Sequence, residues 1–283
     1  MELREPDELV AALRDSGSVF PERELAELQR AARIDDPWAI EMMVERRTLG
    51  EPIEHIVGSA RFAELRVAVH PGVFVPRRRT ELLATIVADR LRELADATAV
   101  REPGATRTPR LLDLGCGTGA IAALALHRVP GIRVVAIDAD PAAVACAREN
   151  LPGALVVLGD GIDALDRLDP RVVDAAGADA SAPFDVIAAN LPYVPTAQLA
   201  LLPHDATEHE PLLALDGGSD GLDPLAEHAP AMLRRLLPGG IAVVEVARHQ
   251  LETATALLRD SGFTACDART DDALGVTAIV ATR

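Results

Sequence analysis

The segment Asn190-Leu191-Pro192-Tyr193 combines a polar amide, a proline-stiffened turn and the only tyrosine of the chain. It directly follows an apolar run, residues 184–189, that the sequence predicts to be a buried strand. In an open α/β sheet, ligands bind at the carboxyl ends of the strands. We therefore expect this segment to carry the chemistry of the protein.

A glycine-rich segment, residues 113–119, has the sequence Asp-Leu-Gly-Cys-Gly-Thr-Gly and joins a predicted strand to a predicted helix. Glycines at such a turn let the backbone approach a ligand closely, because no Cβ stands in the way. The spacing differs from the dinucleotide pattern G-x-G-x-x-G, and it resembles motif I of the class I methyltransferases that use S-adenosylmethionine. The resemblance implies that Asp113, Gly115, Gly117 and Gly119 bind this cofactor.

Two further acidic residues, Asp138 and Asp160, each follow a predicted strand. The carboxylate of Asp138 can accept hydrogen bonds from both ribose hydroxyls, because it offers two oxygens to a vicinal diol. Asp160 can accept one from the adenine amino group. A single acid at such a place is more often a turn or helix-cap residue, but two acids at the ends of successive strands favour a cofactor site.

The chain is predicted to begin with a helical region and to continue through a hairpin. Apolar residues recur with helical spacing over residues 1–54, which predicts an N-terminal helical domain. This domain is a candidate for binding the protein substrate, and a packing module without a ligand is the alternative. Residues 55–76 change to period-two alternation, and Pro71-Gly72 is predicted to turn the chain into residues 73–75. This pattern predicts a β-hairpin linker over residues 55–76.

Residues 77–283 alternate between predicted strands and helices, which is typical of βαβ units and a doubly wound sheet. A first helix is predicted to end before a linker at residues 96–109, and residues 174–183 are predicted to be mobile. A long loop is predicted for residues 190–221. The predicted strands cover residues 111–114, 133–137, 154–158, 184–189 and 241–246, with two more near Phe263 and Val276.

The composition disfavours several classes of partner. Forty-four acidic residues against 28 basic residues, all of them arginine, give a net charge of −16, which repels a phosphate backbone and makes nucleic acid an unfavourable substrate. The three cysteines are far apart and too few for a structural zinc site, which favours a reducing compartment. With no apolar run of about 18 residues and no signal-peptide pattern, we expect a cytoplasmic protein without a membrane partner.

With these motifs in order, residues 40–283 resemble the HemK/PrmC family of protein-glutamine methyltransferases. The resemblance implies an α/β fold of the class I S-adenosylmethionine-dependent type, with a Rossmann-like, seven-stranded and mostly parallel sheet. The catalytic domain would then span residues 77–283, after the helical domain and the hairpin linker. Further segments that match motifs of the family are residues 46–58, 75–81 and 210–221, the pair Glu245 and Gln250, and Val276-Thr277.

Members of this family methylate the side-chain amide of the glutamine in the Gly-Gly-Gln tip of class 1 peptide-chain release factors, so the resemblance implies this partner. An amide nitrogen is a poor nucleophile because its lone pair is delocalised into the carbonyl, and catalysis then depends on positioning. By resemblance, the side-chain oxygen of Asn190 and the backbone carbonyl of Leu191 accept the two amide hydrogens. Pro192 holds Leu191 in an extended conformation.

The resemblance assigns roles to three more residues. Tyr193 packs against the glutamine side chain or the cofactor. Phe74 forms an apolar wall on the substrate side, with a plain role in the core as the alternative. Thr80 lies in the segment that resembles the I-P-R-P-x-T-E motif and, with Asn190, is expected on the cofactor side.

Three departures from the family pattern leave alternatives open. Leu191 stands where the family usually has proline, Arg79 replaces an acidic or polar residue, and Ala247 replaces glycine. A paralogue with another protein substrate is one alternative, and an adenine-amino methyltransferase acting on a flipped or single-stranded base is a second. A third is a non-catalytic scaffold that binds the cofactor without turnover.

Overall fold

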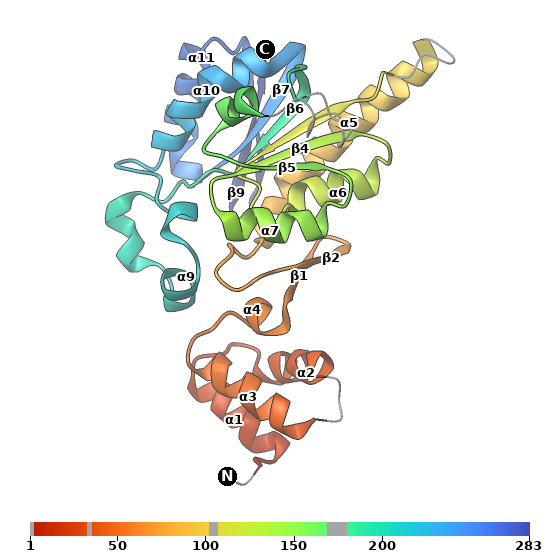
Figure 1. Ribbon diagram of the computed structural model, residues 1–283. Coiled ribbons are helices and arrows are strands. Elements are labelled where there is room, and N and C mark those ends of the chain that lie inside the picture. Colours follow the sequence, from red (N-terminus) through yellow and green to blue (C-terminus); the bar gives the residue numbers. More distant parts are fainter. Residues whose placement is uncertain (1–2, 33–35, 102–106, 169–179) are drawn as a thin grey trace.

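The computed structural model describes residues 3–32, 36–101, 107–168 and 180–283, whose helices and strands are arranged as in Figure 1. The N-terminal helices form a group at the far end from the C-terminus (Figure 1). They share one small core, made of Leu9, Leu13, Leu25, Leu28, Val44 and Ile56. The helices are α1 (Pro6–Asp15), α2 (Pro21–Ala31), α3 (Pro37–Thr48) and α4 (Ile53–Val57). The helical structure predicted for this region is confirmed.

A β-hairpin follows, but its turn is not at the predicted place. Strands β1 (Ser59–Phe62) and β2 (Leu65–Ala68) pair antiparallel, so the two-residue turn lies at Ala63 and Glu64. The predicted turn at Pro71-Gly72 is present, with the N–H of Val73 donating to the carbonyl of His70 at 3.1 Å, but it lies after the hairpin, and the predicted strand at residues 73–75 is wrong. Ala63 adopts a φ of 50°, and its N–H donates to Oε1 of Glu81 at 3.0 Å. A distant carboxylate thus supports a turn that glycine would normally mark.

Helix α5 (Glu81–Arg101) is longer than predicted, because it continues past Asp96, where a linker was expected. The sequence from Asp96 to Arg101 contains neither glycine nor proline, and such breakers first occur at Pro103-Gly104. Part of the predicted linker, residues 102–106, lies outside the described residues, as do residues 174–179 of the segment that was predicted to be mobile.

The strands of the larger part form a seven-stranded sheet in the order β5-β4-β3-β6-β7-β9-β8. The pairs from β5 to β7 are parallel, whereas β9 is antiparallel to both β7 and β8. This arrangement confirms the predicted mostly parallel, doubly wound sheet. The strands are β3 (Arg110–Leu114), β4 (Arg133–Asp138), β5 (Leu155–Leu158), β6 (Phe184–Ala189), β7 (Leu236–Val246), β8 (Ala265–Asp271) and β9 (Val276–Thr282).

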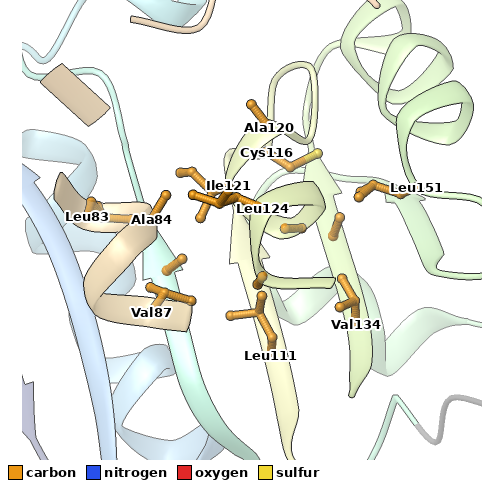
Figure 2. Close-up of a cluster of buried hydrophobic side chains, with 14 of the residues drawn as sticks. Leu83, Ala84, Val87, Leu111, Cys116, Ala120, Ile121, Leu124, Val134 and Leu151 are labelled. Carbon is orange, nitrogen blue, oxygen red and sulfur yellow. The ribbon is translucent and has the colours of Figure 1, made fainter. Parts of the chain in front are cut away.

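Helices cover both faces of the sheet and bury two separate cores. Figure 2 shows one of them, where Leu83 and Val87 of α5 lie with Leu124 of α6 over Leu111 of β3. The other core receives Leu225 from α10 together with residues of α11. The helices that follow α5 on the sheet are α6 (Ala120–Arg128), α7 (Pro141–Asn150), α10 (Asp223–Arg235) and α11 (Leu251–Asp260).

The long connection after β6 is more structured than a loop. It contains the 3-10 turns η3 (Thr196–Leu201) and η4 (Leu212–Ala214) and the short helix α9 (His204–His209). The next strand, β7, begins at Leu236, five residues before the predicted start, with a register shift in its pairing between Phe184 and Val186. In the described part of the chain, no helix is both long and apolar enough to cross a bilayer.

We expect Phe184→Ala to lower the free energy of unfolding by about 3–5 kcal/mol, because a large core side chain is lost and a cavity remains. Phe184 is fully buried on β6, and the guanidinium of Arg110 lies 5.2 Å from the centre of its ring. Urea titration followed by circular dichroism measures the change. Leu201→Ala is the control, since Leu201 is 81% exposed. Equal losses in the two variants would contradict this account of the core.

Candidate active site

A cavity of about 300 Å³ opens at the carboxyl ends of the parallel strands. Its walls come from the loops after β3, β4, β5 and β6, from the start of α10, and from the segment between the hairpin and α5. This is where the strand order changes direction between β3 and β6, the usual ligand position in an open α/β sheet. Of the residues predicted for the site, the cavity is lined by Phe74, Thr80, Gly115, Gly117, Asp138, Asp160, Asn190, Leu191, Pro192 and Tyr193.

The glycine loop takes a conformation that other residues rarely adopt. Gly115, Gly117 and Gly119 have φ values of 67°, 54° and 77°, in the left-handed region. A Cβ on Gly117 would meet no atom within 4 Å, so the backbone there faces open space. Gly119 does not line the cavity, because it begins α6 and lies so close to Leu151 that a Cβ would come within 2.8 Å of that side chain.

Asp113 also lies behind the cavity and not on its wall. Its side chain is fully buried, and Oδ2 accepts a hydrogen bond of 3.2 Å from the backbone N–H of Ala122 in the first turn of α6. Burial, opposed by this hydrogen bond, raises the pKa of the Asp113 carboxyl to about 7. Asp113 therefore supports the start of α6 and the shape of the glycine loop, without reaching the space where a cofactor would lie.

Asp138 connects the glycine loop to the end of β4. Its Oδ2 accepts from the N–H of Gly117 at 2.7 Å, and its Oδ1 accepts from the N–H of Asp140 at 2.9 Å. Burial raises the pKa of the Asp138 carboxyl, while these N–H donors act in the opposite direction. Each carboxylate oxygen keeps acceptor capacity for a diol. Asp160 is exposed on the same cavity, so both acids border one space.

The amide of Asn190 is held from one side. Its Nδ2 donates to Oγ1 of the buried Thr80 at 3.4 Å, which leaves Oδ1 as the acceptor of the side chain. Leu191 is only 8% exposed and belongs to the core on the α10 side of the sheet. A Cβ on Gly115 would lie 3.4 Å from Cδ2 of Leu191, so this side chain fills the space beside the glycine loop.

Tyr193 is fixed by a buried carboxylate that the sequence did not assign to the site. Its hydroxyl donates to Oε1 of Glu245 at 3.1 Å, and the guanidinium of Arg79 lies 5.7 Å from the centre of its ring. Burial, together with the charge of Glu245, raises the pKa of the Tyr193 hydroxyl well above its ordinary value. Tyr193 is therefore a neutral hydrogen-bond donor at physiological pH.

The backbone of Tyr193 is fixed by Gln250, which is also buried. Nε2 of Gln250 donates to the carbonyl of Tyr193 at 2.9 Å and to that of Asp220 at 3.0 Å, and Oε1 accepts from the N–H of Ala247. Gly221 has a φ of 83°, and a Cβ there would lie 2.2 Å from the carbonyl oxygen of Tyr193. The segments after β6 and before α10 are thus locked together at Tyr193.

Glu210 is buried behind the cavity wall, just before Pro211 and Leu213, which line the cavity. Its carboxylate accepts from the N–H of Val75 at 3.0 Å and from Nη2 of Arg77 at 2.8 and 2.6 Å. The guanidinium of Arg77 in turn lies 5.0 Å from the centre of the Phe74 ring. These contacts attach the connection after β6 to the segment before α5 and place Phe74, as expected, on the cavity wall.

Sequence reasoning missed several of these residues as members of the site. Glu210, Glu245 and Gln250 were visible only as matches to motifs of the family, because they support the wall residues from behind. His228 on α10 gave no signal, although it lines the cavity opposite Gly161, where a Cβ would come within 2.7 Å of its Cε1. Residues that meet only through the tertiary fold leave no local pattern.

Comparisons with known proteins agree with this geometry. A family model described as "Methyltransferase small domain" matches residues 64–199. A release factor glutamine methyltransferase of Geobacter sulfurreducens is 37% identical over 226 residues, which are 79% of this chain and 70% of the relative. One of Gloeobacter violaceus is 35% identical over 263 residues, which are 88% of this chain and 83% of the relative.

A further relative carries a different name. The 4-amino-L-phenylalanine/4-methylamino-L-phenylalanine methyltransferase of Streptomyces pristinaespiralis is 35% identical over 221 residues, which are 77% of this chain and 69% of that protein. The seven-stranded sheet, the cavity with its glycine loop and acids, and these relatives lead to one conclusion. The chain belongs to the HemK/PrmC family of S-adenosylmethionine-dependent methyltransferases, which includes the release factor glutamine methyltransferases.

Proposed function

We propose that this protein transfers a methyl group from S-adenosylmethionine to the side-chain amide nitrogen of the glutamine in the Gly-Gly-Gln tip of class 1 peptide-chain release factors. The observation that carries the proposal is the position of Asn190 to Tyr193 on the same cavity as the glycine loop and Asp138. The names of the relatives from Geobacter sulfurreducens and Gloeobacter violaceus support this acceptor.

On this proposal, catalysis rests on how the acceptor amide is held. The Oδ1 atom of Asn190 and the backbone carbonyl of Leu191 accept the two amide hydrogens and turn the nitrogen towards the cofactor side of the cavity. S-adenosylmethionine, when bound, supplies the electrophilic methyl group. The acceptor nitrogen would take this methyl group as the carbon–sulfur bond breaks, and it would lose its proton afterwards. No general base is needed before transfer, because the acceptor is neutral.

The residues on the cofactor side fit this cofactor. Asp138 presents acceptor oxygens for the ribose hydroxyls, and Asp160 lies where it can accept from the adenine amino group. Gly117 faces open space, whereas Gly115 packs closely against the segment after β6, since a Cβ there would lie 3.7 Å from the backbone carbonyl oxygen of Asn190. Thr80 was expected on the cofactor side, but its hydroxyl accepts from Asn190, so we propose that it supports the acceptor clamp, the segment from Asn190 to Tyr193.

The N-terminal helices support a protein acceptor. We propose that residues 1–54 form a domain that binds the protein substrate, joined by the linker at residues 55–76 to the catalytic domain at residues 77–283. Large apolar side chains are exposed in the connection between α1 and α2, where Val19 is 78% and Phe20 is 64% exposed. Such side chains gain free energy when a partner covers them. A release-factor substrate would place the enzyme in the cytoplasm.

A second acceptor class is favoured by Arg79. This residue lines the cavity beside Tyr193, and its side chain is 45% exposed. A cation there suits an acceptor that carries a carboxylate, such as the free aromatic amino acid named for the relative from Streptomyces pristinaespiralis. The nitrogen acceptor would then be an arylamine, which also presents two hydrogens to Asn190 and Leu191.

We expect a deuterated methyl group to be transferred to the Gly-Gly-Gln glutamine when the enzyme is incubated with labelled S-adenosylmethionine and a class 1 release factor. Mass spectrometry of the digested release factor locates the label. A release factor with asparagine in place of that glutamine is the control, and 4-amino-L-phenylalanine is offered in a parallel reaction. Label on the small molecule alone would favour the second acceptor. Cofactor binding with no label on either would favour a non-catalytic scaffold.

We expect Asn190→Ala to lower kcat by about 10²- to 10³-fold, because one of the two groups that orient the acceptor amide is removed. Leu191→Ala keeps the backbone carbonyl and should lose less than about 10-fold, through looser packing beside the glycine loop. Steady-state kinetics with the acceptor found above gives both values. If Leu191→Ala lost as much kcat as Asn190→Ala, the Leu191 side chain would matter for transfer as much as the Asn190 amide, which would contradict this account.

We expect Asp138→Ala to weaken S-adenosylmethionine binding by about 10- to 100-fold, because hydrogen bonds to a charged group are lost. The change also removes the acceptor that holds the N–H of Gly117. Isothermal titration calorimetry measures the affinity without any acceptor. Asp160→Ala provides a comparison at the other end of the cofactor, and Asp267→Ala on the exposed strand β8 is the control. An unchanged affinity in Asp138→Ala would remove this residue from the cofactor site.

A further inference from the structure

Helix α10 places a histidine on the side of the cavity where Asp160 lies. Pro224, Glu227 and His228 all line the cavity. Glu227 and His228 follow Pro224 by three and four residues, so the three share one face of the helix. The adjacent face of α10 contributes Met232 to the core. His228 is half-buried, so part of its ring remains open to the cavity.

The position of α10 is fixed relative to the segment that carries Asp160. The helix packs on the 3-10 turn η2 (Ile162–Arg167), which begins two residues after Asp160. Near the end of α10, Arg235 forms an ion pair with Asp166 of this turn. His228 therefore has a defined place beside Asp160, although the two residues are far apart in the chain.

The ring of His228 lies directly against Gly161. This glycine has a φ of 75° and a ψ of 178°, and a Cβ on it would lie 2.7 Å from Cε1 and 3.0 Å from Nδ1 of His228. A Cβ essentially never comes as close as 2.7 Å to another heavy atom, so the imidazole occupies the space in which a side chain at position 161 would begin. The wall of the cavity next to Asp160 is thus formed by a ring from α10.

The polar atoms of His228 are not used within the protein. Neither ring nitrogen has a hydrogen-bond or ion-pair partner in the part of the chain that the structure describes, and neither is fully enclosed. The imidazole is therefore available to a molecule bound in the cavity. Aromatic side chains, histidine included, stack on the flat faces of nucleic-acid bases.

We propose that His228 is a further cofactor-binding residue, whose imidazole packs against the adenine ring of S-adenosylmethionine beside Asp160. This inference rests on the cofactor site of the proposed function, and it is independent of the acceptor. Adenine offers an amino group that can donate to a carboxylate and a flat ring that can stack on an aromatic side chain. Asp160 and His228 together supply a partner for each.

The test is His228→Ala, with binding of S-adenosylmethionine measured by isothermal titration calorimetry without any acceptor. We expect Kd to rise by about 5- to 100-fold, the usual loss when an aromatic side chain that stacks on a base is removed. His228→Phe keeps a flat ring and should bind within about 3-fold of the unaltered protein. His127→Ala, at an exposed position in the last turn of α6, is the matched control.

Gly161→Ala tests the same contact if His228→Ala does not fold. The new Cβ would displace the imidazole, and the affinity for the cofactor should fall. In the double variant Gly161→Ala/His228→Ala this clash is absent, so Gly161→Ala should cost less than it does with His228 in place, and only the strain of its positive φ remains. Additive losses would mean that the two residues do not act together, which would overturn the proposal.

A pair of ligands separates the ring from the carboxylate. S-inosylhomocysteine differs from S-adenosylhomocysteine in carrying an oxygen in place of the amino group, while its flat ring system is retained. His228→Ala should therefore weaken the binding of both ligands by the same factor. Asp160→Ala should weaken only the binding of S-adenosylhomocysteine, because only this ligand can donate to the carboxylate.

Unchanged cofactor affinity in His228→Ala would overturn the proposal, and so would a loss in His228→Phe as large as that in His228→Ala. A loss in His228→Ala that is confined to S-adenosylhomocysteine would also overturn it, since stacking does not depend on the amino group. The calorimetry needs no acceptor. An unaltered enzyme that binds the cofactor but methylates no acceptor would therefore count against the proposed function alone.

Discussion

The parallel pairing of β3 with β4 on one side and β6 on the other is the constraint on which the site depends. Because the chain leaves these strands in opposite directions along the sheet, the loops that follow them separate and leave a space between them. The glycine loop after β3 and the Asn190 segment after β6 face each other across that space. On the proposed function, the cofactor and the acceptor would therefore meet at one point, although the segments that would bind them are about 75 residues apart in the chain.

The segment proposed to bind the acceptor, Asn190 to Tyr193, is supported by buried polar contacts. Gln250 fixes the backbone at Tyr193, Glu245 fixes its hydroxyl, and Glu210 attaches the opposite wall through Val75 and Arg77. Buried groups of this kind are costly unless they are paired, and when paired they define a single arrangement. The residues proposed to bind the cofactor depend more on local structure. They are glycines in left-handed conformations and two acids that follow strands.

Much of the fold and part of the site could be predicted from the sequence, because they follow from patterns within short segments. The strands from β3 to β6, the glycine loop and Asp138 all follow from periodicity and spacing. The turn at Ala63 could not be predicted, because its support comes from Glu81, and the extension of α5 was hidden by a composition that resembles a linker. Asp113 was placed on the cofactor from its motif, whereas burial puts it behind the loop. Glu245 shows the same limit: its partners are distant in the chain.

Gly221 has a consequence for how acceptor preference can diverge in this lineage. Any side chain at that position would collide with the carbonyl of Tyr193 and with Gln250, so Gly221 cannot be substituted without moving the backbone at Tyr193. The side chains of Arg79 and Leu191, in contrast, border the cavity, and both residues already differ from the family pattern. After a gene duplication, substitutions at these two positions would therefore be expected to change which acceptor is methylated, while the geometry of methyl transfer stays the same.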